Sequence, residues 1–279
     1  MKRILLTGTS GFLGSRILTY YKEKYHILAP SHVEMDITDW DSILQYFKNC
    51  QPDIVIHCAA ISDTGTCEKN PDLSFAVNAT GSENMTKVSS LFGAKCILCS
   101  SDQVYCNSAY ENANFETDIV TPYNVYGKHK LAAEQSCLAL NPDSVHLRLA
   151  WMYDSEIDME APRSDFAKQL LRSITEKSDL ALPINDKRGI TDVWEVVRNI
   201  EKTFDLPGGV YNFGSPNYKS TYETALCVLD TLHCDTSILK EKVYDKARNL
   251  SMSQEKLDSF GIHFSSTEDA LIQCLKNYI

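Results

Sequence analysis

The sequence predicts an α/β protein built on a doubly wound parallel sheet, and the observations behind this prediction lie in the first 150 residues. Short runs rich in Ile, Val and Leu alternate there with amphipathic stretches of helical length. Strands that are apolar along their whole length are typical of a parallel sheet covered by helices on both faces. Ligands of such sheets bind at the carboxyl ends of the strands, so the residues that follow the strands are the first candidates for a site.

Five strands and four helices are expected in this region. The strands are predicted at residues 3–7, 25–29, 53–57, 94–99 and 144–149. The helices are predicted at residues 12–21, 39–48, 72–91 and 122–140, each between two of these strands. Asp39 is expected to cap the second helix and Pro122 to open the fourth, because both residue types favour helix starts.

The alternation of strand and helix becomes irregular after Trp151. Helices are predicted at 162–175, 191–204, 221–232, 253–259 and 266–276, with short strands at 180–182 and 210–213. We therefore expect a first domain at residues 1–150 and a small mixed α/β region at 151–279 that acts as its lid. No clean linker separates the two, so the chain is free to cross between them.

The composition excludes several classes of protein. Hydrophobic residues make up 43% of the 279 and charged residues 23%, which is ordinary for a globular protein and unlike a disordered chain or a coiled coil. The net charge of −10 argues against nucleic acid as a partner. No apolar run approaches the roughly 18 residues of a membrane helix, and Ile4-Leu5-Leu6 is too short for a signal peptide core. We expect a cytoplasmic protein with no membrane partner.

The ten cysteines show no spacing typical of a disulfide framework. Cys96 and Cys99 form a C-x-x-C sequence, but it lies in a predicted strand, where residues three apart point to opposite faces. We therefore interpret the cysteines as reduced, buried and structural, and we expect no metal site.

Three glycines, Gly8, Gly11 and Gly14, follow the first strand and open the first helix. Glycines let the backbone turn tightly and approach a pyrophosphate, whose charge then lies at the helix N-terminus. The first gap is one residue wider than in the common G-x-G-x-x-G pattern. A plain tight turn is the alternative, but the position between strand and helix favours a dinucleotide site and, with it, a Rossmann-type fold.

The form of the dinucleotide depends on the turn after the second strand, which offers Ser31 and His32. A carboxylate at this turn would bind the ribose hydroxyls of NADH and repel the 2′-phosphate of NADPH. Because the turn itself carries none, the sequence favours NADP(H) over NAD(H). Glu34 reaching the ribose would reverse that preference.

Tyr126 and Lys130 lie four residues apart, on one face of a predicted helix. The spacing alone is weak evidence, because Tyr20 and Lys24 repeat it within the first helix. Only Tyr126 comes with a hydroxyl at the carboxyl edge of the sheet, that of Ser101. In this arrangement Tyr126 could give a proton to a carbonyl oxygen that Ser101 holds, while the Lys130 ammonium lowers the pKa of the phenol.

With these motifs, the sequence resembles the extended short-chain dehydrogenases/reductases and, within them, the family of dTDP-4-dehydrorhamnose reductases. The similarity is densest from residue 1 to about 153. It is carried by residues 7–14, Asp36-Ile-Thr-Asp39, residues 52–60, Asn78-Ala79, Ser100-Ser-Asp-Gln-Val-Tyr105, Glu116-Thr-Asp118 with Pro122, residues 126–130, and Arg148-Leu-Ala-Trp-Met-Tyr153.

The resemblance implies reduction of a nucleotide-activated 4-keto-6-deoxysugar, and it assigns roles to individual residues. The implied catalytic residues are Ser101, Tyr126 and Lys130. Together with Ser31 of the turn, the cofactor-binding residues are Gly8, Ser10, Gly11, Phe12, Leu13, Gly14, Asp36, Ile37, Cys58, Ala59, Ala60, Asn78, Tyr126 and Lys130. The residues implied to face the nucleotide sugar are Ser62, Asp102, Trp151 and Arg248.

Four positions depart from the family pattern, and all are expected on the substrate side. A common Val-Asp is here Thr64-Gly65, Asp-Gly is Cys106-Asn107, Pro-Thr is Ile190-Thr191, and Arg-Pro is Arg248-Asn249. These departures leave the identity of the sugar open. Trp151 has a second interpretation as a plain core residue.

Two other functions stay open. An epimerase or dehydratase on the same scaffold would keep its nicotinamide bound and recycle it. A regulatory subunit resembling the methionine adenosyltransferase beta subunit would bind NADP and modulate a partner enzyme without catalysis. By analogy with the fold, we also expect that the protein can form a homodimer.

Overall fold

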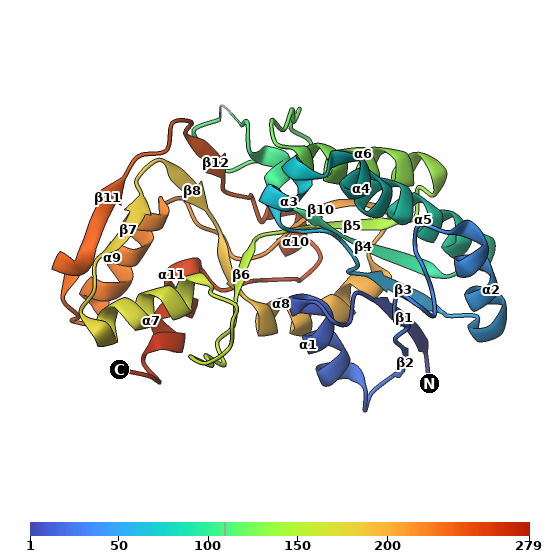
Figure 1. Ribbon diagram of the computed structural model, residues 1–279, viewed down its shortest axis with the longest axis horizontal. Helices are drawn as coiled ribbons and strands as arrows, with labels where there is room; N and C mark the ends of the chain where they lie inside the picture. The colour runs from blue at the N-terminus through green and yellow to red at the C-terminus, as the bar shows by residue number, and fades with distance from the viewer. Residues whose placement is uncertain (109) are drawn as a thin grey trace. The chain divides into compact units, whose positions relative to one another are not determined.

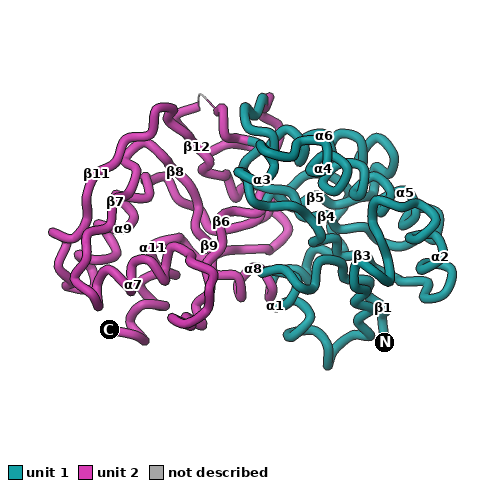
Figure 2. The backbone as a smooth tube through the Cα atoms, in the orientation of Figure 1, with its two compact units in different colours: residues 1–104, 121–148, 199–211 teal, residues 105–120, 149–198, 212–279 magenta. Residues whose placement is uncertain are grey.

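The computed structural model describes residues 1–108 and 110–279, and it divides into two compact units. Unit 1 comprises residues 1–104, 121–148 and 199–211, and unit 2 comprises residues 105–120, 149–198 and 212–279 (Figure 2). The chain therefore crosses between the units several times.

The largest sheet has six strands in the order β10-β5-β4-β3-β1-β2. Its strands are β1 (Arg3–Thr7), β2 (His26–Leu28), β3 (Ile54–His57), β4 (Lys95–Ser101), β5 (Val145–Leu149) and β10 (Gly209–Phe213). The pairs β1·β2, β1·β3 and β3·β4 run parallel, so these strands end at one edge. This confirms the predicted fold class and places all five expected strands. The sixth strand comes from the predicted run at 210–213.

Helices cover both faces of this sheet. They are α1 (Phe12–Tyr21), α2 (Trp40–Cys50), α3 (Thr64–Lys69), α4 (Pro71–Phe75), α5 (Gly81–Leu91) and α6 (Val125–Leu140), with shorter helical turns η1 (Ala76–Thr80), η2 (Asp102–Tyr105) and η3 (Glu201–Asp205). In Figure 1, α5 and α6 lie on one side of the strands and α1 on the other. One buried cluster joins Phe47 of α2, Met85 of α5 and Cys137 of α6 to Val55 and Leu98 of the strands.

The predicted helix at 72–91 is helical along its length but not uniform. It consists of α4, one π-helical turn at η1, and α5. Such wide turns often occur at functional sites, and this one carries Asn78. The helix predicted from Pro122 begins at Val125, with the Asn124 side chain as its N-cap.

Unit 2 contains three two-stranded parallel sheets, β11·β7, β12·β8 and β6·β9. Its elements are β6 (Trp151–Tyr153), α7 (Phe166–Glu176), β7 (Leu180–Pro183), β8 (Asp186–Arg188), β9 (Ile190–Asp192), α8 (Val193–Ile200), α9 (Thr221–Thr231), η4 (Thr236–Ile238), β11 (Leu239–Lys242), β12 (Arg248–Leu250), α10 (Glu255–Asp258) and α11 (Thr267–Leu275). Tyr153, Phe166, Val228 and Leu271 belong to its buried core. The helix predicted at 191–204 begins two residues later, because Thr191 and Asp192 belong to β9.

Within the described residues, the structure has no helix that is both long and apolar enough to cross a membrane.

Candidate active site

The glycine turn after β1 is built so that the backbone can approach a ligand. Gly8 has φ of +71°, a conformation that side chains other than glycine's disfavour. A Cβ atom there would lie 2.6 Å from the backbone nitrogen of Ala59. The Gly8 carbonyl accepts a hydrogen bond from Gly11 N at 3.0 Å, which closes the turn.

The N-terminus of α1 is open to an anion. Its N-cap, Gly11, provides no side-chain hydrogen bond, and the first turn contains no acidic residue. By contrast, α2 is capped by Asp39, which accepts from Asp41 N. The N–H groups of the first helical turn and the helix dipole at α1 therefore suit a phosphate. The residues present fit a dinucleotide pyrophosphate.

The segment after β3 is held in place from both sides. Ala59 N donates to Thr7 Oγ1 at 3.2 Å, and Ile61 is paired with Asn78 through two hydrogen bonds of 2.8 and 2.9 Å. Asn78 is fully buried on the π-helical turn η1. It therefore positions the predicted cofactor residues Cys58, Ala59 and Ala60.

The turn after β2 was expected to carry no carboxylate group, but the structure places one there. Glu34 accepts hydrogen bonds from both Ser31 N and Ser31 Oγ, each at 2.8 Å, and these bonds lower the pKa of its carboxyl group. A carboxylate thus lies directly at Ser31. Asp36 accepts from Thr38, whereas Ile37 is buried in the unit 1 core against Gly81.

Ser101, Tyr126 and Lys130 come together within unit 1. The Ser101 side chain lies close enough to the Tyr126 phenol to lower its pKa, and Lys130 Nζ lies 5.8 Å from the centre of the Tyr126 ring. Nζ donates to the Cys99 carbonyl oxygen at 2.8 Å. The second Tyr-x-x-x-Lys sequence has no such setting, since Tyr20 is about half exposed on α1.

Burial dominates the ionisation of these groups. It raises the pKa of Tyr126 above its ordinary value, and the neighbouring Ser101 side chain only partly offsets that effect. Burial also lowers the pKa of Lys130, although neighbouring thiols and Glu134 oppose this. The expected net lowering of the Tyr126 pKa is therefore wrong: burial outweighs any effect of the Lys130 charge, and the pKa is raised. A neutral phenol beside a serine hydroxyl is a proton donor, which suits reduction of a carbonyl group.

Contacts that the sequence analysis missed hold α6 against the end of β4. Asn124 Nδ2 donates to Gln103 Oε1 at 3.0 Å, and Ser100 Oγ donates to Glu134. Glu134 also forms a buried ion pair with Arg148 of β5, with the shortest N–O distance 2.7 Å. Glu134 is four residues after Lys130, so helical spacing alone places both on one face and is a signal in the sequence. These contacts fix Tyr126 relative to Ser101.

The predicted substrate residues fall in both units. Ser62 is exposed and Asp102 is buried in unit 1, where Asp102 accepts a hydrogen bond from Ser101 Oγ at 3.2 Å. In unit 2, Trp151 packs edge-on against Phe166, and the Arg188 guanidinium lies 4.9 Å from the centre of the Trp151 ring. Trp151 is only partly buried, so beside this packing its substrate-facing role stays a prediction.

One of the four family departures, Arg248-Asn249, has structural partners in unit 2. Arg248 forms a bidentate ion pair with Asp186, with both distances 2.9 Å. Asn249 donates through its side chain to the carbonyl oxygens of Tyr110 and Asn112. A proline at position 249 could not make these bonds, so this departure changes how residues 110–112 are held.

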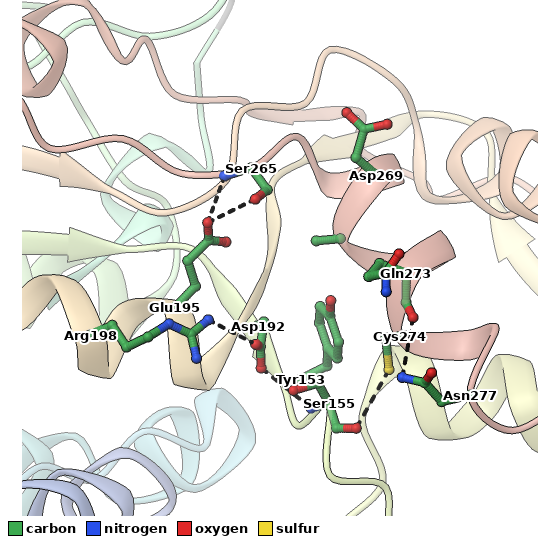
Figure 3. Close-up of a pocket in the computed structure, with 11 residues that line it drawn as sticks. Tyr153, Ser155, Asp192, Glu195, Arg198, Ser265, Asp269, Gln273, Cys274 and Asn277 are labelled. Atoms are coloured by element: carbon green, nitrogen blue, oxygen red, sulfur yellow. Dashed lines mark hydrogen bonds and ion pairs between the residues drawn. The ribbon is translucent and has the colours of Figure 1, made fainter.

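A pocket of about 530 Å³ lies in unit 2, and none of the predicted site residues line it (Figure 3). Asp192 accepts from Ser155 N at 3.3 Å and pairs with Arg198 at 3.7 Å, while Glu195 accepts from Ser265. Burial raises the pKa of Asp192. Among residues 1–108 and 110–279, no group of three His, Cys, Asp or Glu side chains is placed to hold a metal.

A parallel sheet with a glycine turn opening its first helix, and a buried Ser-Tyr-Lys group at the strand ends, define a Rossmann-type protein of the reductase and epimerase class. Comparison with known families is more specific. The model described as the RmlD substrate binding domain matches residues 1–279. The chain belongs to this family.

Individual relatives agree with this assignment. The chain is 28% identical over 240 residues to the Bacillus subtilis spore coat polysaccharide biosynthesis protein SpsK, covering 86% of this chain and 82% of that protein. It is 36% identical over 154 residues to the dTDP-4-dehydrorhamnose reductase of Mycolicibacterium smegmatis, covering 54% and 46%. It is 28% identical over 283 residues to the methionine adenosyltransferase 2 subunit beta of Xenopus laevis, covering 94% and 83%.

Among solved structures, the chain is similar to the dTDP-4-dehydrorhamnose reductase of Bacillus anthracis, which was determined in complex with NADP. The TM-score is 0.84 at 25% sequence identity, and the match covers 99% of each chain.

Proposed function

We propose that this protein is an NAD(P)H-dependent reductase of a nucleotide-activated 4-keto-6-deoxysugar, of the dTDP-4-dehydrorhamnose reductase type. The observation that carries this proposal is the buried group of Ser101, Tyr126 and Lys130 at the end of β4. Family membership and the reductase relatives support the substrate class. The cytoplasm is the proposed location, consistent with ten cysteines that are all free thiols.

The proposed chemistry divides between cofactor and protein. When bound, the nicotinamide supplies hydride to the carbonyl carbon of the sugar. The Tyr126 phenol donates its proton to the carbonyl oxygen, and the Ser101 hydroxyl donates a hydrogen bond to the same oxygen. Lys130, held by the Cys99 carbonyl, places a positive charge near the phenolate that forms and stabilises it.

The cofactor is proposed to be NADPH, the form favoured by the sequence and the form bound by the Bacillus anthracis relative. The carboxylate of Glu34 at Ser31 opposes a 2′-phosphate. We therefore expect only a modest preference for NADPH over NADH.

The first test follows NADPH absorbance with freshly prepared dTDP-4-dehydrorhamnose. We expect the wild type to oxidise NADPH and Tyr126→Phe to lose about 100- to 10,000-fold in kcat, as for removal of a general acid. Tyr20→Phe is the matched control, because it alters the other Tyr-x-x-x-Lys sequence on the exposed side of α1, and it should retain wild-type turnover. Equal rates for wild type and Tyr126→Phe would contradict the assignment of the proton donor.

A regulatory function is the second candidate, because the methionine adenosyltransferase beta subunit matches 94% of this chain. The NADPH absorbance assay distinguishes a reductase from a regulatory subunit. A protein that binds NADPH, oxidises none of it with several 4-keto sugars, and retains a stoichiometric partner enzyme on an affinity column would be regulatory. Tightly bound cofactor without net oxidation would instead indicate an epimerase.

A further inference from the structure

Two thiols face each other at the carboxyl edge of the main sheet. Cys58 directly follows β3, and Cys99 lies near the end of β4. The parallel register pairs His57 with Leu98, so the next residues along, Cys58 and Cys99, are cross-strand neighbours. Their sulfur atoms are 3.5 Å apart. Both are partly exposed, in contrast to Cys67, Cys96 and Cys137, which are buried.

The geometry is close to that of a disulfide. A disulfide bond is about 2.05 Å long and accepts Cα separations of roughly 4.4 to 6.8 Å. Neighbouring strands lie about 4.7–4.9 Å apart, which is within that range. The sulfurs must therefore approach by about 1.5 Å, which small side-chain rotations can supply. The register of the sheet does not have to change.

The two thiols are also electrostatically unequal. The two thiols share a hydrogen bond in which either sulfur can be the donor. With Cys58 as the donor, this bond lowers the pKa of Cys99 and raises that of Cys58. The Lys130 ammonium, which donates to the Cys99 carbonyl, also favours a thiolate. Cys99 therefore ionises first, and thiolates are the reactive form of cysteine.

We propose that Cys58 and Cys99 form a reversible redox site, which a peroxide oxidises to an intramolecular disulfide. The Cys99 thiolate attacks one oxygen of hydrogen peroxide, the O–O bond breaks, and Cys99 sulfenic acid forms while hydroxide takes up a proton to become water. The Cys58 thiol then attacks the sulfenic sulfur, the S–O bond breaks, and a second water leaves with the Cys58 proton. In total, two thiols lose two electrons and two protons, and peroxide becomes two waters. A dithiol reductant reverses the step.

This redox site lies against the proposed cofactor turn. A Cβ atom on Gly8 would be 2.7 Å from the Cys58 carbonyl carbon, so the turn packs directly on the Cys58–Ala59 backbone. Cys99 meanwhile holds the Lys130 ammonium through its carbonyl oxygen. We expect the disulfide to weaken NADPH binding and bound NADPH to slow oxidation. This consequence rests on the proposed function, whereas the disulfide itself does not.

The test oxidises the reduced full-length protein with hydrogen peroxide, blocks free thiols by alkylation, and maps cysteines by mass spectrometry. We expect a Cys58–Cys99 linked peptide that dithiothreitol abolishes, while Cys96 and Cys137 stay reduced. In Cys58→Ser, dimedone should trap a sulfenic acid at Cys99, because the resolving thiol is missing. Cys227→Ser, which removes a partly exposed thiol on α9, is the matched control and should leave the linked peptide unchanged.

Several outcomes would overturn the proposal. The first is the absence of the linked peptide under conditions that oxidise Cys50 or Cys227. The second is a Cys58→Ser protein in which dimedone does not label Cys99. The expected coupling between NADPH binding and disulfide formation is measured separately. At NADPH concentrations of ten times Kd, oxidation should slow about tenfold, since only about one-eleventh of the protein is free. A disulfide that forms at the same rate with NADPH would support the redox site and contradict the proposed cofactor site.

Discussion

At the scale of single residues, burial determines the protonation state of the Tyr126 phenol. The sequence predicted the neighbourhood of Ser101, Tyr126 and Lys130 correctly, because helical spacing and the end of a strand bring them together. It predicted a lowered pKa for Tyr126, which is the wrong direction for the shift. That shift depends on how closely α6 packs on β4, and burial raises the pKa. The phenol therefore stays protonated until a substrate carbonyl accepts its proton.

The cofactor preference should depend on the charge of Glu34. In Glu34→Gln the side chain keeps its size and can still accept from Ser31, but it no longer repels a 2′-phosphate. We expect the ratio of kcat/KM for NADPH to that for NADH to rise several-fold, mainly through the KM for NADPH. An unchanged ratio would mean that Glu34 does not face the ribose. Asp41→Asn, which neutralises an exposed carboxyl group in the first turn of α2, is the control and should leave the ratio unchanged.

His57 should make the protein less stable in acid. Burial lowers its pKa from about 6.5 to about 3, while Nδ1 bonds the Thr7 hydroxyl at 2.8 Å. Between these values the unfolded chain binds a proton that the folded protein does not, so stability is full above pH 6.5 and is lost as the pH falls. His57 alone should remove about 2 kcal/mol between pH 7 and pH 5.

Urea unfolding at the two pH values measures this effect. His57→Asn, whose amide can replace Nδ1, should lose about half of the histidine-dependent decrease. Burial also lowers the pKa of His146, to about 4, so His146→Asn should lose the other half. If His57→Asn kept the full decrease, the acid sensitivity would arise elsewhere.

At the scale of elements, the sequence predicted long regular elements well and short ones poorly. The predicted ranges of β1 and α1 agree with the structure residue for residue, because their apolar patterns are long and glycines mark the boundary. The strands β6, β8, β9, β11 and β12 were not predicted. Each has three or four residues and is defined by pairing with a distant partner, for example β12 with β8. The residues of a short segment do not indicate which distant strand it pairs with.

The glycine turn gives a prediction with an internal control. Gly8 and Gly93 have nearly the same positive φ, +71° and +67°, but a Cβ on Gly93 would meet no atom within 4 Å. Gly93→Ala should therefore cost only the conformational penalty of about 1 kcal/mol. Gly8→Ala should cost more, because its methyl group would collide with the Ala59 backbone, and it alone should weaken NADPH binding. Urea unfolding and NADPH titration measure the two effects. Equal stability and binding in the two variants would exclude a close approach at Gly8.

At the scale of the whole molecule, sequence patterns do not predict which segments of the chain belong to which of the two units. The sequence analysis placed a division near residue 150 and found no linker. In the structure, residues 105–120 belong to unit 2 and residues 199–211 to unit 1. The segment at 199–211 joins unit 1 partly through β10, a five-residue strand whose neighbour β5 is about sixty residues earlier. Composition does not change at these crossings, so neither crossing could be predicted.

The interleaved chain predicts that the two units unfold together. Each unit is built from three separate segments, so neither is available as one continuous stretch of chain. The three tryptophans allow a direct measurement, since Trp40 lies in unit 1 and Trp151 and Trp194 lie in unit 2. The double variant Trp151→Phe/Trp194→Phe reports unit 1 by fluorescence, and Trp40→Phe reports unit 2.

We expect one urea transition for each variant, coincident with its own circular dichroism transition. NADPH at 100 times Kd should add about 2.7 kcal/mol to the unfolding free energy seen by either tryptophan set. The predicted dinucleotide-binding residues all lie in unit 1. A shift of the transition reported by the unit 2 tryptophans therefore requires that the two units unfold together. If NADPH shifted only the Trp40 transition, unit 2 would unfold independently despite the interleaved chain.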